Sequence, residues 1–272
     1  MTPTVVDTRQ VRRHFSCHAE DYDRYALVQK RVVDELLALL RRKSPSDGPV
    51  LDVGTGTGAL AASVAREFAN RPLVLCDLAH GMTLHAAGQL AGALALDADA
   101  QALPFRDGRF GLLVSSSVYQ WLNDLPAAFA EALRVLSPGG GLGIALFGER
   151  TLYELRTSHR RAVAEAGADH PSHAQDFPTQ AAVRQALDGA GFEAIEVRSA
   201  DEIEHHPDVP ALLRSLKKIG AQNASSDRPA GLSSRRVMQR MAELYQQDFG
   251  GAGSIPATYQ VIYALARKPL IP

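Results

Sequence analysis

Three glycines separated by single threonines follow a short apolar run at residues 50–58, Val-Leu-Asp-Val-Gly-Thr-Gly-Thr-Gly. The apolar run is typical of a buried strand, and the glycines allow a tight, partly left-handed turn after it. A helix that begins near Ala59 then directs its first backbone N–H groups back across the turn. Because the glycines carry no Cβ atom, a ligand can approach the backbone closely. The segment therefore predicts a strand–turn–helix unit that binds a cofactor.

The composition is that of an ordinary globular protein and disfavours several classes of function. The chain has 272 residues, of which 46% are hydrophobic and 22% charged, and its net charge is −1. A nearly neutral molecule has no overall field that would attract nucleic acid or a membrane surface. Its two cysteines, Cys17 and Cys76, make no disulfide framework, and no apolar stretch is long enough to span a membrane. The polar N-terminal region does not resemble a signal peptide, so we expect a cytoplasmic protein.

Strand and helix signals alternate along most of the chain. This alternation predicts an α/β fold, namely a doubly wound, mainly parallel sheet of seven strands. The expected strands are residues 50–53, 73–76, 93–97, 110–115, 142–147, 193–199 and 257–267. The expected helices are residues 9–20, 26–42, 59–68, 80–90, 125–136, 151–166 and 179–190.

Two segments with helical periodicity lie outside this alternating pattern. One precedes the first strand, and the other separates the last two strands. We therefore expect a helical N-terminal arm and a helical cap that is inserted before the last strand. The predicted divisions are the arm at 1–43, the cofactor-binding core at 44–200, the basic cap at 201–255 and the final core strand at 256–272.

Two kinds of cofactor fit the glycine turn itself. The glycine spacing at residues 54–59, with Asp77 further along the chain, also satisfies the dinucleotide-binding pattern, which leaves a nicotinamide or flavin cofactor open. Asp52 favours S-adenosylmethionine (SAM), because a carboxylate before the glycines can meet the ammonium group of a methionine moiety. A pyrophosphate gains nothing from an anion at that place. Asp99 also favours SAM, because its carboxylate can accept a hydrogen bond from an adenine amino group.

Three blocks carry a resemblance to a known family. They are Leu-Asp-Val-Gly-Thr-Gly-Thr-Gly at 51–58, Asp-Ala-x-x-Leu-Pro-Phe at 99–105 and Arg-Val-Leu-x-Pro-Gly-Gly at 134–140. Together they resemble the class I SAM-dependent methyltransferases, which have a Rossmann-like fold. The resemblance implies that Asp77 holds the ribose hydroxyls and Asp99 the adenine. The candidate cofactor-binding residues are Asp52, Gly54, Thr55, Gly56, Gly58, Asp77, Leu78, Asp99, Ala100 and Ser115.

Further blocks narrow the resemblance over nearly the whole chain. They include His-Phe-Ser at 14–16, Gln-Trp at 120–121, Leu-Lys-x-Ile-Gly-Ala at 216–221 and Pro-x-Thr-Tyr-Gln-Val-Ile-Tyr at 256–263. These blocks are similar to those of the malonyl-[acyl-carrier-protein] O-methyltransferase family of early biotin synthesis. The resemblance implies methylation of the free carboxylate of a malonyl group carried by an acyl carrier protein. The chain departs from the family pattern at Cys17-His18 and at residues 116–119, Ser-Ser-Val-Tyr.

Positive charge is concentrated in the expected cap. Residues 209–241 contain seven lysines and arginines against a single aspartate, and their apolar residues recur at helical spacing. The cations should therefore face outward, where they would steer an acidic partner such as an acyl carrier protein. A solvated helix surface that binds nothing is the alternative. Nucleic acid is disfavoured because no aromatic residues interleave the cations. The candidate carrier-binding residues are Arg214, Lys217, Lys218, Arg235, Arg236 and Arg240.

The methyl acceptor implied by the resemblance needs no general base. A malonyl carboxylate has an ordinary pKa of about 4 and is already an anion at neutral pH. A cation on the carboxylate would weaken it as a nucleophile, so neutral hydrogen-bond donors are expected around it. The candidates are Tyr22 of the arm, with Tyr25 as its substitute, Gln120 and Trp121 after the fourth strand, and His173.

Other functions stay open at this point. A methyltransferase with the same core could act on a free dicarboxylate or a quinone ring, a nicotinamide-dependent oxidoreductase could use the glycine turn, and a binding protein could retain the fold without catalysis. The histidines do not form a metal-ligand pattern, so no metal is expected. We also expect a monomer.

Overall fold

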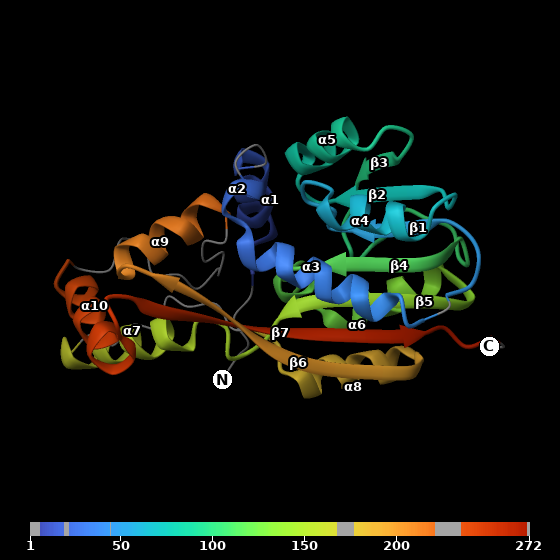
Figure 1. Cartoon of the computed structure of the whole chain (residues 1–272). Coiled ribbons are helices and arrows are strands. Elements are labelled where there is room, and N and C mark those ends of the chain that lie inside the picture. Colours follow the sequence, from blue (N-terminus) through green and yellow to red (C-terminus); the bar gives the residue numbers. More distant parts are fainter. Residues whose placement is uncertain (1–5, 19–21, 44, 168–176, 221–234, 271–272) are drawn as a thin grey trace.

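The computed structural model describes residues 6–18, 22–43, 45–167, 177–220 and 235–270. Its centre is a seven-stranded sheet in the order β3-β2-β1-β4-β5-β7-β6, with helices on both faces (Figure 1). Strands β1 to β5 run parallel to their neighbours among these five, whereas β7 is antiparallel to both β5 and β6. This architecture confirms the predicted doubly wound, mainly parallel sheet.

The strands alternate with helices along the chain as predicted. The strands are β1 Val50–Val53, β2 Leu73–Asp77, β3 Leu94–Asp97, β4 Phe110–Ser116, β5 Leu136–Phe147, β6 Glu193–His206 and β7 Ile255–Arg267. The central strands β1 and β4 are almost wholly buried. Strands that are covered on both faces are rich in Val and Leu throughout, which explains why their sequence shows apolar runs rather than alternation.

The described helices include the two expected segments outside the alternating pattern. The helices are α1 Thr8–His18, α2 Tyr22–Tyr25, α3 Leu27–Leu40, α4 Ala59–Glu67, α5 His80–Gln89, α6 Leu125–Val135, α7 Tyr153–Glu165, α8 Gln180–Ala190, α9 Val209–Lys218 and α10 Arg235–Phe249, with a short 3-10 helix η1 at Tyr119–Trp121. None of the helices in the described part of the chain is both long and apolar enough to cross a membrane.

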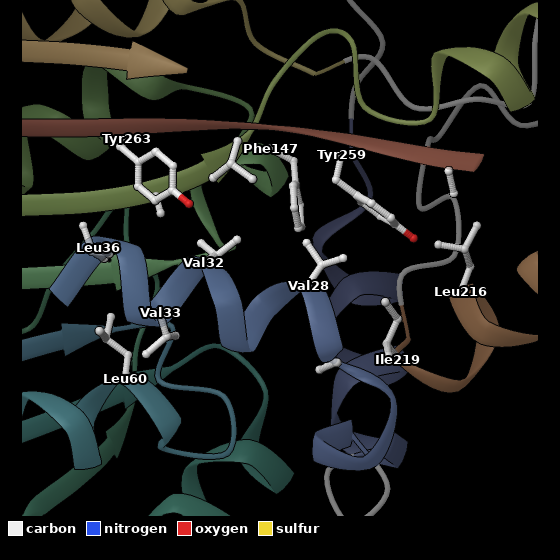
Figure 2. Packing of buried hydrophobic residues seen from close by; sticks show 14 of the residues in the cluster. Val28, Val32, Val33, Leu36, Leu60, Phe147, Leu216, Ile219, Tyr259 and Tyr263 are labelled. Atoms are coloured by element: carbon white, nitrogen blue, oxygen red, sulfur yellow. The ribbon is translucent and has the colours of Figure 1, made fainter. Parts of the chain in front are cut away.

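Helix α3 packs an apolar stripe onto one face of the sheet. Val28, Val32 and Leu36 recur at helical spacing and are buried. They lie opposite Phe147 of β5 and Tyr263 of β7 (Figure 2). The stripe fixes the position of α3, whose first turns reach the carboxyl ends of the central strands.

The opposite face of the sheet is covered by α6 and α8. Phe129 of α6 and Leu187 of α8 are fully buried in this second part of the core. Strand β4 contributes to both faces, because successive side chains of a strand point to opposite sides. Leu112 and Val114 contact the cluster around α3, whereas Leu113 belongs to the cluster around α6.

Strand β6 is longer than the sequence pattern indicates. It continues to His206, although the charged residues after position 199 resemble a loop. Glu202 pairs with Tyr259 and Glu204 with Ala257 of β7, so residues 201–206 extend the sheet. Both glutamates are half-buried, and Glu202 accepts from the Arg31 guanidinium at 2.6 Å, so its charge is balanced by α3. The helical segment before the last strand therefore starts after His206, not at residue 201.

Strand β5 begins earlier than expected. The Pro-Gly-Gly-Gly segment at 138–141, which resembles a turn in the sequence, lies within β5. The register between β4 and β5 shifts between Phe110 and Leu112, which is the mark of a bulge. Gly139 has a φ of 74° at this irregularity. The glycines here allow a bulge within the strand, and the strand continues past them.

Helices α9 and α10 lie at one end of the sheet beside α7 (Figure 1). Leu212 of α9 and Leu244 of α10 are fully buried in the same cluster as Val32 and Tyr263. Tyr153 of α7 packs edge-on against Phe249 of α10, with ring centroids 5.8 Å apart. The inserted helices therefore extend the core on the α3 side, and a separate cap domain remains a prediction.

Replacement of Gly111 by alanine should destabilise the fold. A Cβ atom at this position in β4 would lie 2.3 Å from the Ser46 carbonyl oxygen and 2.5 Å from that of Asp47. We expect a loss of about 1–3 kcal/mol in the free energy of unfolding, because backbone must move. Urea titration measures the change. The control is Gly88→Ala in α5, where no atom lies within 4 Å of the added carbon and a gain of roughly 0.5–1 kcal/mol is expected. Equal midpoints for Gly111→Ala and wild type would contradict the packing.

Candidate functional site

A pocket lies at the carboxyl ends of β1, β2 and β4, against α1 and the start of α3. Strands β2 and β4 flank β1 on opposite sides, and such a reversal of strand order is where ligands bind in open α/β sheets. The lining residues come from α1 (Thr8, Val11, Phe15), α3 (Gln29, Lys30, Val33), the glycine turn (53–57), the ends of β2 (Asp77, Leu78) and β3 (98–101), and the end of β4 (116–118, Trp121, Leu122).

The glycine turn is held by the backbone of the neighbouring strand. The N–H groups of Gly54 and Thr55 both donate to the Cys76 carbonyl oxygen, at 2.7 and 3.0 Å. Gly54 has a φ of 68°, and a Cβ there would lie 2.2 Å from a methyl carbon of Val118. Gly56 has a φ of 56°, and a Cβ there would meet no atom within 4 Å. Any side chain at these positions would strain the turn, so the pocket is lined there by bare backbone.

Asp52 presents an incompletely satisfied carboxylate at the end of β1. Its side chain is 1% exposed, and its Oδ2 accepts a hydrogen bond of 2.9 Å from the Thr55 hydroxyl. Its Oδ1 is buried and has no hydrogen-bond partner among the described residues. Removal from water raises the pKa of Asp52 to about 7, and repulsion from Asp77 adds to this effect. A bound cation would relieve both costs.

Asp77 joins the glycine turn to the end of β2. Its Oδ2 accepts from the Gly56 N–H at 2.9 Å and its Oδ1 from the Ala79 N–H at 2.8 Å. Burial raises the pKa of Asp77, and these two N–H groups oppose the effect. Each carboxylate oxygen can accept a second hydrogen bond, so Asp77 can still bind ligand hydroxyls.

Arg134 holds the loop that follows Asp99. Asp99 Oδ1 accepts from the Gln101 N–H at 2.9 Å and forms the first turn of that loop. The Arg134 guanidinium donates to the carbonyl oxygens of Leu103 and Phe105 at 2.9 and 2.6 Å. Glu131 pairs with Arg134, which lowers the pKa of the Glu131 carboxyl. The arginine of the third sequence block therefore fixes the second block, with its aspartate, beside the pocket.

Most of the predicted cofactor residues are found at this pocket. Asp52, Gly54, Thr55, Gly56, Asp77, Leu78, Asp99 and Ala100 line it. Ser115 and Gly58 are not among the lining residues that the structure describes. Ser115 is fully buried, and its hydroxyl donates to the Val53 carbonyl at 2.6 Å, so it joins β4 to β1. Gly58 caps α4 and faces Leu90 and Ala86.

The predicted acceptor residues are only partly brought together. Trp121 lines the pocket and packs edge-on against Phe15, with ring centroids 5.7 Å apart. Gln120 is buried, and its Oε1 accepts from the Phe147 N–H at 3.4 Å. Gln120 is absent from the described pocket lining. His173 and the side chain of Tyr22 lie outside the residues that the structure describes.

Lys30, Ser116 and Ser117 are pocket residues that sequence reasoning missed. Lys30 stands next to Gln29 on α3, and nothing in the local sequence distinguishes it from a surface lysine of an amphipathic helix. Ser116 and Ser117 carried a signal, since both lie in the segment that departs from the family pattern. Whether each serine lines the pocket depends on the face of the strand end to which its side chain points. Three serines in a row do not show which face that is.

The basic residues of the inserted helices are mostly exposed. Arg214, Lys217, Lys218, Arg235 and Arg236 face water. Lys218 also donates to the Tyr25 hydroxyl at 2.9 Å and lies 4.1 Å above the centroid of the Tyr25 ring. Arg240 is different, because it pairs with Glu165 at 2.6 Å and with Glu243 at 3.1 Å. Its charge is therefore largely balanced within the molecule.

Known proteins resemble this chain at the level of sequence and of fold. Residues 51–144 match the methyltransferase domain family. A malonyl-[acyl-carrier protein] O-methyltransferase of Geobacter sulfurreducens is 47% identical over 97% of this chain and 100% of its own length. One of Methylococcus capsulatus is 34% identical over 96% of this chain and 94% of its own length.

Solved structures with low sequence identity share the fold. The YcgJ protein of Bacillus subtilis has a TM-score of 0.60 at 15% identity and covers 87% of this chain and 99% of its own. Phosphoethanolamine N-methyltransferase 2 of Haemonchus contortus, solved with S-adenosyl-L-methionine, has a TM-score of 0.53 at 20% identity. It covers 87% of this chain, and the match spans 52% of its own length.

The Asp52 carboxyl should make SAM binding depend on pH. Its pKa is about 7 in the free protein, and a cationic ligand favours its ionised form, so affinity should rise as the pH increases from 6 to 8. Calorimetric titration at several pH values measures the change. Asp52→Asn should bind SAM roughly ten- to hundredfold more weakly at pH 8 and lose most of the pH dependence. The control is Asp188→Asn, an exposed position on α8. A wild-type affinity that is flat with pH would contradict the assignment.

Proposed function

The chain belongs to the malonyl-[acyl-carrier protein] O-methyltransferase family, and from this premise we propose that it methylates the free carboxylate of a malonyl group on an acyl carrier protein. The product would be a malonyl methyl ester, still attached to the carrier, in an early step of biotin synthesis. The observation that carries the proposal is the pocket at the switch of strand order, where Asp52 presents a buried, unpartnered oxygen to a cation.

The family match confirms a SAM-dependent methyltransferase and therefore the cofactor expected from the sequence. The pocket residues fit this cofactor. Asp52 would bind the ammonium group, Asp77 the ribose hydroxyls and Asp99 the adenine amino group, and these residues lie at the ends of the neighbouring strands β1, β2 and β3. When bound, SAM supplies an electron-poor methyl group on a cationic sulfur.

Lys30 completes the charge balance of the proposed cofactor site. The methionine part of SAM carries a carboxylate as well as an ammonium group. Lys30 is the cation among the charged side chains that line the described part of the pocket, and the others are aspartates. It projects from α3, the helix that runs beside the glycine turn through contacts such as Val33 with Leu60 (Figure 2). We assign the cofactor carboxylate to Lys30.

Transfer then requires alignment without proton transfer. A malonyl carboxylate has a pKa of about 4 and is ionised at neutral pH. One of its oxygens would form the new bond to the methyl carbon, and the sulfur would leave with the electron pair of the carbon–sulfur bond. The residues of the chain hold the two partners in line, which can be worth up to roughly 7–11 kcal/mol. Positive and negative charge neutralise each other in this step, so a water-poor pocket favours it.

Helix α1 would exclude water from the reacting groups. Phe15 packs against Trp121 on one side and against Met82 and Ala79 on the other. Its helix is anchored where the Ser16 hydroxyl accepts from the Gly81 N–H at 3.5 Å. The arm thus forms an apolar wall of the pocket, which is the role that the water-sensitive transfer demands.

The exposed cations of α9 and α10 support recognition of an acidic carrier protein. Arg214 and Lys217 of α9 and Arg235 and Arg236 of α10 are exposed. Arg240 contributes less to our proposal because Glu165 and Glu243 already balance it. We further propose a monomer that works in the cytoplasm.

Incubation of malonyl carrier protein with SAM and the enzyme tests the proposed reaction. Mass spectrometry should show the gain of one methyl group, which mild ester hydrolysis removes. Arg214→Glu combined with Lys217→Glu should raise KM for the carrier-bound substrate about tenfold or more, because steering is lost. The same variant should leave KM for malonyl-coenzyme A nearly unchanged. Arg109→Glu, a single charge reversal at an exposed position just before β4, is the control for charge reversal away from the pocket end. No methyl transfer to the carrier would refute the function.

A neutral residue at position 30 tests the assignment of Lys30. Lys30→Met keeps much of the aliphatic stem and removes the charge, so the Kd for S-adenosylhomocysteine should rise roughly tenfold or more. The Kd for 5′-methylthioadenosine, which lacks the amino acid carboxylate, should stay the same. Equal losses for the two ligands would show that Lys30 acts on the fold of the pocket and not on the carboxylate.

A further inference from the structure

Three consecutive serines span the end of β4, and their hydroxyls have different surroundings. The Ser115 hydroxyl donates to the Val53 carbonyl. The hydroxyl oxygens of Ser116 and Ser117 are buried, and neither has a hydrogen-bond partner among the described residues. Both residues line the cofactor pocket. A buried hydroxyl without a partner carries a desolvation cost that a ligand at the pocket can offset.

The backbone at Ser117 is strained in addition. Its φ is 60°, in the left-handed region that a residue with a Cβ atom rarely adopts. The Ser117 N–H donates to the Ala145 carbonyl of β5 at 2.8 Å, which holds the residue in this conformation. Such strain is commonly found where a side chain must be aimed at a ligand. Glycine would remove the strain at this position, yet the chain carries a hydroxyl there.

The sheet order places the two serines next to the proposed cofactor groups. The strand order β3-β2-β1-β4 puts Asp99, Asp77 and Asp52 at the ends of three successive strands. The two serines lie at the end of β4, the next strand, so they line the part of the pocket beyond the residues assigned to the adenine, the ribose and the ammonium group. We therefore expect the second substrate on this side of the pocket.

We propose that Ser116 and Ser117 donate hydrogen bonds to the carboxylate of the methyl acceptor and so orient it toward the methyl group. This inference rests on the proposed function and names the residues that recognise its acceptor. Rotation about the Cα–Cβ bond moves each hydroxyl between staggered positions, one of which can face the pocket. Two hydroxyls hold a carboxylate without adding a positive charge, so the oxygen that attacks keeps its negative charge.

The serines replace hydrogen-bond donors that were predicted from the sequence but that lie away from the described pocket lining or outside the described residues. Gln120 accepts from the Phe147 N–H and is absent from the described pocket lining. Trp121 remains at the pocket with its ring against Phe15. Ser116 and Ser117 therefore supply the small neutral donors that the ionised acceptor needs at the end of β4.

The experiment compares hydroxyl removal at both positions with hydroxyl retention at position 116. Ser116→Ala and Ser117→Gly each remove one hydroxyl, and glycine suits the left-handed backbone at 117. Each should lower kcat/KM for malonyl carrier protein by roughly ten- to hundredfold, as expected for a lost hydrogen bond to a charged group. The Kd for S-adenosylhomocysteine should stay within about twofold of the wild type. Ser116→Thr, which keeps the hydroxyl in a strand position, should retain most of the activity.

Other outcomes would overturn the assignment. If both variants methylate at the wild-type rate, or if S-adenosylhomocysteine binding weakens in parallel with turnover, the serines do not bind the acceptor. Ser115→Ala serves as the structural comparison, because it should lower the thermal midpoint through the lost bond to Val53 while kcat/KM changes little per folded molecule. Wild-type enzyme that binds S-adenosylhomocysteine but does not methylate the carrier would refute the proposed function itself, separately from the roles of the serines.

Discussion

The buried carboxylate of Asp52 determines much of the structure around it. It lies at the end of the central strand β1, where water is excluded, and one of its oxygens is held by Thr55. The glycine turn folds directly above it because two N–H groups of the turn bind the Cys76 carbonyl of β2. The turn, the neighbouring Asp77 and the unpartnered oxygen of Asp52 thus form one polar site inside an apolar sheet. A ligand with a positive charge and an N–H donor would satisfy the ionised form of this site.

The N-terminal helices complete this site from outside the sheet. Val6 exchanges two backbone hydrogen bonds with the Asn123 side chain, at 2.8 and 3.0 Å, which ties the arm to the loop after β4. Phe15 then packs over Met82 and against Trp121. The pocket therefore has a polar floor, which the strand ends form, and an apolar wall, which helix side chains form. Under the proposed reaction between a sulfonium and a carboxylate, the floor would bind the cofactor and the wall would exclude water.

The sheet and the polar floor of the pocket could be predicted from the sequence because their signals are local. Apolar runs mark strands, and glycines with adjacent aspartates mark a turn that must bind something. The face to which a residue at a strand end points is not determined by the local sequence. The sequence predicts Ser115 in the pocket, but its side chain points to Val53, and Ser116 and Ser117 line the pocket instead. The strand predicted at 193–199 is too short for a related reason, since residues 201–206 are held in the sheet by pairing with the distant strand β7.

The Arg134 guanidinium bonds to two carbonyl groups of the loop at 103–107, and Glu131 binds the N–H of the same loop. Insertion or deletion in that loop would forfeit several of these bonds at once, so its length is fixed by the helix beneath it. The described helices between β6 and β7 are held instead by side-chain contacts to other elements, as between Lys218 and Tyr25 and between Arg240 and Glu165. Single substitutions can therefore remodel that surface one contact at a time, whereas any change in the length of the 103–107 loop breaks several bonds together.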